Sequence, residues 1–161
     1  MDEFWNTWQP RERATLCFVI EAENILLIRK KRGLGAGKIN APGGRIEPGE
    51  EPHECAVRET SEEVGLTPLN VRKRGELHFQ FADGYSLHCA VFVANEYSGE
   101  LLETDEALPI WTPLNRIPYE EMWADDIHWL PGLIEGGTFR GYFHFDGEKM
   151  LSKHLIWEGR E

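Results

Sequence analysis

Residues 44–66 constrain this chain more than any other segment, because their glutamates are spaced for one face of a helix. A helix repeats every 3.6 residues, so Glu59, Glu62 and Glu63 fall side by side at i, i+3 and i+4. Like charges stacked in this way destabilise a helix by roughly 0.2–0.5 kcal/mol per pair, and a bound cation would offset that repulsion. Carboxylates without a nearby cysteine or histidine cluster favour Mg²⁺, with Mn²⁺ as a substitute, over zinc.

A bare acidic run is more often a solvated surface face, so the neighbouring residues have to decide between the two interpretations. A proline–glycine pair marks a loop before a helix predicted over residues 52–64, and Gly65 stops that helix. Arg58 is predicted to lie too far round the helix to join the acidic face. We expect it to pair instead with Glu50 and so to fix the loop against the helix.

The same stretch resembles the Nudix box, G-x5-E-x7-R-E-U-x-E-E-x-G-U, in which U is a bulky aliphatic residue. The matching residues are Gly44, Glu50, Arg58, Glu59, Glu62, Glu63, Gly65 and Leu66. Thr60 stands where an aliphatic residue belongs, and we expect it to loosen helix packing without removing a metal ligand. The resemblance implies an α/β/α sandwich around a mixed β-sheet. It also implies cleavage of a nucleoside diphosphate linked to another moiety.

The apolar segments outside the box predict a single domain over residues 1–161. Hydrophobic residues make up 41% of the chain, which is enough for one buried core. Helices packed on a mixed sheet give an α/β (α+β) fold. The predicted strands are 15–20, 25–29, 71–81, 86–95, 110–111, 139–145 and 150–157, and the predicted helices are 52–64 and 122–134.

Three segments keep two interpretations each. Pro131 limits or bends the second helix unless it lies near the first turn. Residues 1–11, which hold two tryptophans, either pack across the domain or form a flexible arm. The basic cluster at residues 29–32 is either a strand end turning into a loop or a phosphate contact.

The composition limits the partners of the chain. A formal net charge of −11 argues against a nucleic-acid polymer, which needs a basic surface. A small anionic nucleotide remains compatible with that charge, because a divalent metal inverts the local field. The N-terminus has no apolar signal core, and no segment is apolar for long enough to span a bilayer, so we expect no membrane partner. We take a monomer as the working expectation.

The three cysteines indicate a reducing compartment. Cys17, Cys55 and Cys89 are scattered, odd in number and without CxxC spacing. We expect two of them in strands and one in a helix, all reduced, in a cytoplasmic protein.

The resemblance to the Nudix box also implies the chemistry of the site. We expect Glu59, Glu62 and Glu63 to hold the metal together with the backbone carbonyl of Gly43 and a distant carboxylate, Glu106. An exposed acidic turn is the alternative for Glu106. Glycine at 43 and 44 lets the backbone approach an ion or a phosphate closely. The general base stays open between a box glutamate and a distant one.

Four segments outside the box narrow the substrate. Residues 30–40, 104–111, 117–129 and 139–147 resemble the MutT-homologue group of Nudix hydrolases, which remove oxidised purine nucleoside triphosphates from nucleotide pools. That resemblance implies purine hydrogen bonds from Asn40, Asp125 and Asp126, with Trp123 stacked on the base. The other expected substrate-binding residues are Thr15, Lys30, Pro42, Gly43, Gly44 and Arg45.

Physical chemistry supports this pocket but leaves alternatives. Trp stacks on any base, at ~1–3 kcal/mol per base, and two adjacent buried carboxyls can share one proton that donates to an oxo group. Asp125 or Asp126 could instead cap the helix, and Trp123 could be ordinary core. Leu34 and Pro42 stand at positions where the resemblance implies aromatic residues beside the pocket. They leave 8-oxo-dGTP, 2-hydroxy-dATP and a methylated purine triphosphate open as substrates.

The leading expectation is Mg²⁺-dependent hydrolysis of a damaged purine (deoxy)nucleoside triphosphate to the monophosphate and pyrophosphate. Other Nudix substrates are the alternatives: a nucleoside diphosphate sugar, a dinucleoside polyphosphate or a capped RNA, the last disfavoured by the acidic charge. A non-catalytic nucleotide sensor is a different class. Such a sensor would be expected to have lost a box glutamate, and none is missing here.

Overall fold

Strand β1 (Glu12–Glu21) organises the fold in the computed structural model, which describes residues 2–161. β1 runs parallel to β7 (Ser86–Ala94) along most of its length. It pairs with β2 (Asn24–Lys30) only beside their connecting turn, so the predicted strands 15–20 and 25–29 form a hairpin. Its earlier residues pair instead with β4 (Gly43–Arg45). β1 and β2 therefore diverge away from the turn, and this divergence opens the site described below.

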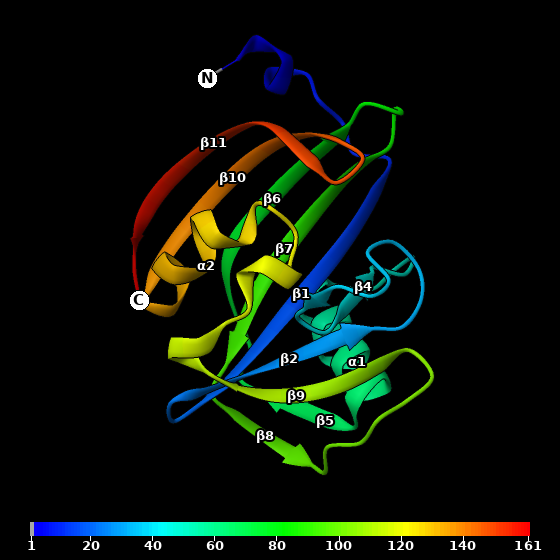
Figure 1. Cartoon of the computed structure of the whole chain (residues 1–161), viewed down its shortest axis with the longest axis vertical. Helices are drawn as coiled ribbons and strands as arrows, with labels where there is room; N and C mark the ends of the chain where they lie inside the picture. Colours follow the sequence, from blue (N-terminus) through cyan, green and yellow to red (C-terminus); the bar gives the residue numbers. More distant parts are fainter. Residues whose placement is uncertain (1) are drawn as a thin grey trace.

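The remaining strands extend this pair into one mixed sheet of nine strands (Figure 1). Parallel pairing of β6 with β10, and of β1 with β7, makes the sheet mixed, as predicted. In order, the main path is β11 (Lys149–Arg160), β10 (Gly137–Asp146), β6 (Arg72–Phe81), β7, β1, β2 and β3 (Ile39–Asn40), with β4 beside β1 and β9 (Ala107–Pro113) beside β2. A separate pair, β5 (Leu66–Leu69) and β8 (Glu96–Gly99), was not predicted.

Two hydrophobic cores lie on opposite faces of the sheet, one under each helix. Phe18 of β1 packs in the core that holds Trp129 of α2 (Asp126–Ile134). Its neighbours Cys17 and Val19 pack in the core that holds Ala56 of α1 (Pro52–Val64). Because successive strand residues point to opposite faces, this alternation places one helix on each side of the sheet and gives the expected sandwich.

Helix α1 has the boundaries that the sequence predicted, and its end signals explain them. Pro52 occupies the first turn, and Glu51 and Glu54 form a capping box. Gly65 ends the helix with φ of +81°, a left-handed conformation that favours glycine. Thr60 is fully buried and donates its hydroxyl to Ala56 O at 2.8 Å, so its one polar atom is satisfied within the helix.

Helix α2 is shorter than predicted. It begins at Asp126 rather than at residue 122, because Met122 is extended, with φ of −108° and ψ of 173°. The preceding chain forms two short 3-10 turns, Leu114–Arg116 and Tyr119–Glu121. Pro131 lies inside the helix on an exposed position, where the carbonyl that it leaves unbonded can reach water.

The N-terminal segment packs against the sheet, which is one of the two arrangements left open by the sequence. It forms a 3-10 turn, Glu3–Asn6, beside the β10–β11 hairpin (Figure 1). Trp5 is buried and lies against Tyr142 and His144, with ring centroids 5.3 and 4.9 Å away. Trp8 donates its indole N–H to Gln80 Oε1 at 2.9 Å.

Two further expectations concern the whole chain. The three cysteines are free and buried, two in strands and one in a helix as predicted. Within residues 2–161, neither helix is long and apolar enough to cross a membrane.

Candidate active site

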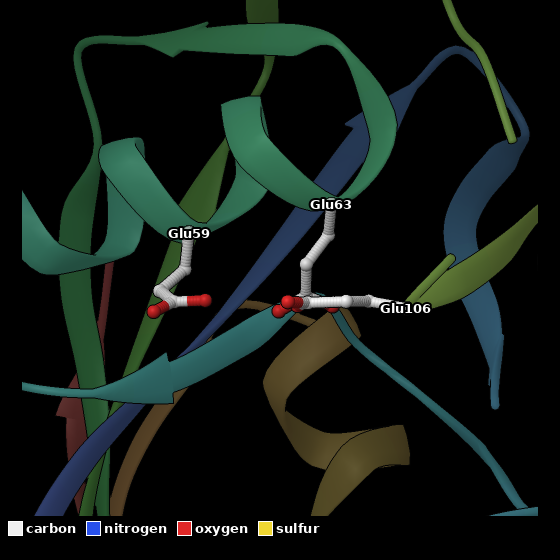
Figure 2. Close-up of side chains that lie close together, drawn as sticks. All are labelled: Glu59, Glu63 and Glu106. Atoms are coloured by element: carbon white, nitrogen blue, oxygen red, sulfur yellow. The ribbon is translucent and has the colours of Figure 1, made fainter. Parts of the chain in front are cut away.

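Three carboxylates from two separate parts of the chain converge at one end of α1. Glu59 and Glu63 come from α1, and Glu106 comes from the loop before β9 (Figure 2). One oxygen from each lies within 4.8 Å of the other two. Glu59 and Glu63 point from the same side of the helix, as their four-residue spacing requires. The structure thus brings the distant residue Glu106 to the acidic face of the helix.

The charges of this cluster are not balanced within it. Glu63 is only 5% exposed, and its Oε1 accepts the backbone N–H of Gly43 at 3.3 Å. Burial and the negative charges of Glu59 and Glu106 raise the pKa of Glu63 to about 8. Burial likewise raises the pKa of Glu59, against the lowering effect of Arg58. An oxygen-only donor set with repelling charges fits a hard divalent cation, which would remove this repulsion.

Glu62 does not join the cluster, although the sequence grouped it with the metal ligands. Its side chain is 58% exposed, and Oε2 accepts from Arg58 Nη1 at 3.2 Å. Counted from Glu59, Glu62 at i+3 points its carboxylate toward solvent, whereas Glu63 at i+4 faces the sheet.

The contacts of Arg58 differ in part from those expected. It pairs with Glu50 as predicted, with Nε at 2.7 Å from Oε2 and Nη2 at 3.0 Å from Oε1. Its Nη1 also donates to Glu59 Oε1 at 2.8 Å, so the prediction that Arg58 lies too far round the helix to reach the acidic face is wrong. The long side chain bends along the helix surface. Arg58 therefore fixes both the loop and one carboxylate of the cluster.

The glycines of β4 make room for neighbouring protein atoms. A Cβ on Gly43 would lie 2.0 Å from the backbone oxygen of Thr15, inside the β1–β4 pairing. A Cβ on Gly44 would lie 2.4 Å from Cδ of Glu59. Glycine at 44 is thus required by the position of a cluster carboxylate.

A pocket of about 130 Å³ opens next to the cluster, between the diverging strands β1 and β2. Pockets that enclose a whole drug-sized ligand measure roughly 300–1,000 Å³, so this one suits a single ring system with the rest of the ligand outside. Glu63 lines the pocket and therefore connects it to the cluster. Of the predicted substrate-binding residues, Thr15, Lys30, Asn40, Gly43, Gly44, Trp123, Asp125 and Asp126 line it.

Asp125 and Asp126 are two adjacent buried carboxyls in the wall of this pocket, at 1% and 3% exposure. Asp125 Oδ2 accepts the indole N–H of Trp129 at 2.8 Å. Asp125 Oδ1 and Asp126 Oδ2 are buried without a hydrogen-bond partner in residues 2–161. Although Asp125 occupies the N-cap position of α2, its side chain makes no capping bond. The capping alternative therefore does not account for the pair.

The two carboxyls affect each other strongly. Burial raises the pKa of Asp125 to about 6. Burial and the neighbouring charge of Asp125 raise the pKa of Asp126 well above its usual value. Two adjacent carboxyls with raised pKa values can share one proton, and the pair then offers both a donor and an acceptor to a ligand.

Trp123 and Asn40 lie on other walls of the pocket. Trp123 is half-buried, with its ring edge-on to Phe81 and Phe145 at centroid distances of 6.1 and 5.6 Å. Its exposure in the pocket distinguishes it from ordinary core. Asn40 Oδ1 accepts from the backbone N–H of Ala41 at 2.8 Å, which leaves the amide group as its donor.

Pro42 and Arg45 do not line the pocket among the described residues, although both were expected to bind substrate. Pro42 is buried, and its carbonyl accepts from the N–H of Cys17 at 2.9 Å. Arg45 is exposed and pairs with Glu12 at 2.6 Å. Leu34, by contrast, flanks the pocket as expected.

In the basic cluster at residues 29–32, three side chains form ion pairs within the protein, and one lines the pocket. Three of its side chains pair with carboxylates: Arg29 with Glu121, Lys31 with Glu103 and Arg32 with Glu106. Lys30 instead lines the pocket and stays available for an anionic ligand.

Several apolar lining residues escaped the sequence analysis. Phe79, Phe81 and Phe145 form one group on β6 and β10, in which Phe81 stacks on Phe145 and Phe79 is tilted against both. Cys89 lies beside the aspartate pair. Alternation along residues 77–81 predicts that Phe79 and Phe81 lie on one face of the sheet. The core and the pocket lie on that same face, so alternation cannot tell a pocket residue from a core residue.

Comparison with known proteins agrees with this geometry. The NUDIX domain family model matches residues 10–133. An oxidized purine nucleoside triphosphate hydrolase of Danio rerio is 41% identical over 145 residues, covering 89% of this chain and 93% of that protein. The Mus musculus protein of the same name is 37% identical with the same coverage. The crystal structure of a MutT protein from Bacillus halodurans has a TM-score of 0.81 at 29% identity, covering 89% of this chain and 97% of that one.

Proposed function

The chain belongs to the Nudix family, and we propose that it hydrolyses oxidised purine (deoxy)nucleoside triphosphates, such as 8-oxo-dGTP and 2-hydroxy-dATP, to the monophosphate and pyrophosphate. Two relatives that match over most of their length carry the name of this activity. Removal of such nucleotides would keep damaged purines out of DNA.

The observation that carries this proposal is the Asp125–Asp126 pair in a pocket that also contains Glu63. Two buried oxygens without partners are costly unless a ligand satisfies them. A purine whose ring has gained an oxo or hydroxyl group presents donors and acceptors that the undamaged base lacks. A carboxyl pair that shares one proton can hydrogen-bond to more than one such arrangement of donors and acceptors. This supports a group of oxidised purines as substrates.

The chain positions the rest of the nucleotide from the pocket outward. We propose that Trp123 stacks on the base and that Asn40 donates to its edge. Lys30 lies on the pocket wall and would meet a phosphate. With the base in the pocket, the phosphates lie toward Glu63 and the cluster.

We propose Mg²⁺, with Mn²⁺ as a substitute, as the metal that Glu59, Glu63 and Glu106 hold. When bound, such an ion neutralises phosphate charge and lowers the pKa of a water nucleophile. Gly43 N–H orients Glu63, and Arg58 orients Glu59, so the protein presets both carboxylates. The backbone carbonyl of Gly43 remains a proposed ligand, whereas Glu62 is less supported because its carboxylate faces solvent.

We propose a cytoplasmic monomer. Three free, buried cysteines suit a reducing compartment. The pocket and the cluster are both formed within one chain, which is compatible with a monomer.

A pyrophosphate-release screen with Mg²⁺ tests the proposal. The panel contains 8-oxo-dGTP, 2-hydroxy-dATP, a methylated purine triphosphate, the undamaged nucleotides and ADP-ribose. We expect fastest release from an oxidised purine, with the monophosphate as the second product. Preference for undamaged dGTP or for ADP-ribose would overturn the proposal, and binding without any release would favour a nucleotide sensor.

A further inference from the structure

Trp123 separates the base pocket from a second, outer cleft. The outer cleft measures about 660 Å³ and lies among the glycine-rich loop, residues 33–38, and the turns after β6 and β10. Leu34, Phe81 and Trp123 line both hollows, whereas Lys38 and Glu148 line only the outer one. The indole is therefore a wall with open space on its outer side, and this side must be supported if the ring is to hold a base.

Lys38 provides a contact on that outer side. Its Nζ lies 5.3 Å from the centroid of the Trp123 ring, within the range of a cation–π interaction. The same ammonium lies 2.6 Å from Glu148 Oε1, in the turn between β10 and β11. The Lys38 side chain is 22% exposed and that of Glu148 is 71% exposed. The ion pair thus ties the glycine-rich loop to the hairpin turn across the outer face of the indole.

The loop also contacts the edge of the indole. Gly35 has φ of +81°, and a Cβ there would lie 2.8 Å from Trp123 Nε1. Local turns hold the loop, with Lys38 N–H donating to Gly35 O at 2.9 Å and Gly37 N–H donating to Lys30 O at 2.7 Å. Gly35 and Lys38 therefore reach the ring from one hydrogen-bonded loop, at its edge and at its face.

We propose that Lys38 and Glu148 are positioning residues for substrate binding: their ion pair braces Trp123 from the outer cleft and so presents its inner side to the base. This inference rests on the proposed function, in which Trp123 stacks on the purine. Without the brace, the indole can swing into the outer cleft, and each binding event must then order it again.

The brace acts on binding and leaves cleavage alone. Lys38 is absent from the described residues that line the base pocket, and the carboxylate cluster is built from Glu59, Glu63 and Glu106. Loss of the brace should therefore raise KM with little change in kcat, which is the signature of lost uniform binding. Substitution of a residue needed only for folding would not raise KM while leaving kcat unchanged.

The test compares K38M and E148Q with the conservative variant K38R. K38M keeps the length of the side chain without its charge, and E148Q keeps Lys38 but removes the pairing carboxylate. K153M, an exposed lysine on β11, is the matched control. For each protein we would measure kcat and KM with the purine triphosphate that the parent hydrolyses fastest. The Kd of the corresponding monophosphate, measured by calorimetry without metal, gives a readout independent of turnover.

We expect KM and Kd to rise about 3- to 20-fold in K38M and less in E148Q, with kcat within about twofold of the parent. K38R should stay close to the parent, because arginine keeps a cation over the ring. Unchanged KM and Kd in K38M or in E148Q, or equal changes in K38M and K153M, would overturn the inference. E148Q is decisive because it breaks the ion pair but keeps the Lys38 charge, which also lowers the pKa of Asp126. If K38M does not fold, E148Q decides by the same criteria. A parent that hydrolyses no oxidised purine overturns the proposed function instead, which is visible before any variant is made.

Discussion

The indole Nε1 of Trp129 donates a hydrogen bond of 2.8 Å to Oδ2 of Asp125, four residues earlier in the chain. Trp129 is fully buried and stacks on Phe139 at a centroid distance of 5.2 Å. Asp125 lines the base pocket, and its other oxygen has no hydrogen-bond partner among residues 2–161. The packing of a core side chain thus fixes the orientation of a binding carboxyl, and one oxygen remains for the ligand.

Replacing Trp129 with phenylalanine should separate these two roles. Phenylalanine keeps an aromatic ring in the core but removes the donor, which leaves a second oxygen of Asp125 buried without a partner. We expect about 1–3 kcal/mol less free energy of unfolding, and a higher KM for the preferred purine nucleotide with kcat largely retained. Urea unfolding and initial-rate kinetics measure the two effects. An unchanged KM would show that Asp125 needs no orientation from the core.

The aspartate pair should give the protein an unusual dependence of stability on pH. The pKa of Asp125 is raised to about 6, and that of Asp126 is raised well above 3.8. Between about pH 4 and pH 6, the folded state retains protons that the unfolded chain has released, so this pair makes stability fall as pH rises. Asp126→Asn cannot ionise at that position, so the fall should be smaller in D126N than in the parent.

The exposed Asp146 supplies the matched control for that experiment, as D146N. Unfolding by urea at several pH values gives, for each protein, the slope of the free energy of unfolding against pH. A slope in D126N equal to that of the parent would contradict the buried, proton-sharing arrangement.

Local signals in the sequence predicted much of the framework. A proline at the start and a glycine at the end set the limits of α1, and the apolar runs 71–81 and 86–95 predicted the strands that pair as β6 and β7. Strand β9 was longer than the predicted residues 110–111, because Pro109 and Pro113 interrupt its pattern. β9 pairs only with β2, so it is an edge strand, where prolines can place their missing donor outward.

The site was less predictable, because tertiary contacts decide it. Helical spacing placed Glu62 and Glu63 on one face, but only the fold shows that one faces the sheet and the other solvent. Arg58 reaches Glu59 through the length of its side chain, which a helical projection does not represent. Glu106 reaches the cluster because of the path that the chain takes between β8 and β9. Its sequence neighbours alone fit an exposed acidic turn equally well.

Two neighbouring glutamates should differ sharply in their effect on turnover. Glu63→Gln removes a carboxylate from the cluster, whereas Glu62→Gln alters a solvent-facing side chain that pairs with Arg58. We expect kcat to fall about 100-fold or more in E63Q, in keeping with several kcal/mol of metal-dependent stabilisation, and about threefold or less in E62Q. Mg²⁺ titrations of initial rates measure both. Equal losses would place Glu62 in the metal site after all.

Alanine at Gly43 and at Gly44 should have different consequences. G43A forces a Cβ against the backbone of Thr15, which cannot move without breaking the β1–β4 pairing, so we expect about 1–3 kcal/mol of destabilisation. G44A meets only the end of the Glu59 side chain, so we expect a smaller loss of stability and a larger loss of turnover. Thermal unfolding and kcat, measured on both variants, test the contrast. A fully active G44A would show that the observed position of Glu59 is not the productive one.

The most direct test of the whole account is the ratio of kcat/KM for 8-oxo-dGTP to kcat/KM for dGTP, measured with Mg²⁺ in the parent and in D126N. We propose that the glutamate cluster cleaves the substrate and that the aspartate pair selects the base. We therefore expect a parent ratio of about tenfold or more in favour of the oxidised nucleotide, the equivalent of one buried hydrogen bond. In D126N we expect a marked change of that ratio, with kcat for the better substrate retained. A parent that prefers dGTP, or a D126N variant with the parent's ratio, would contradict the account.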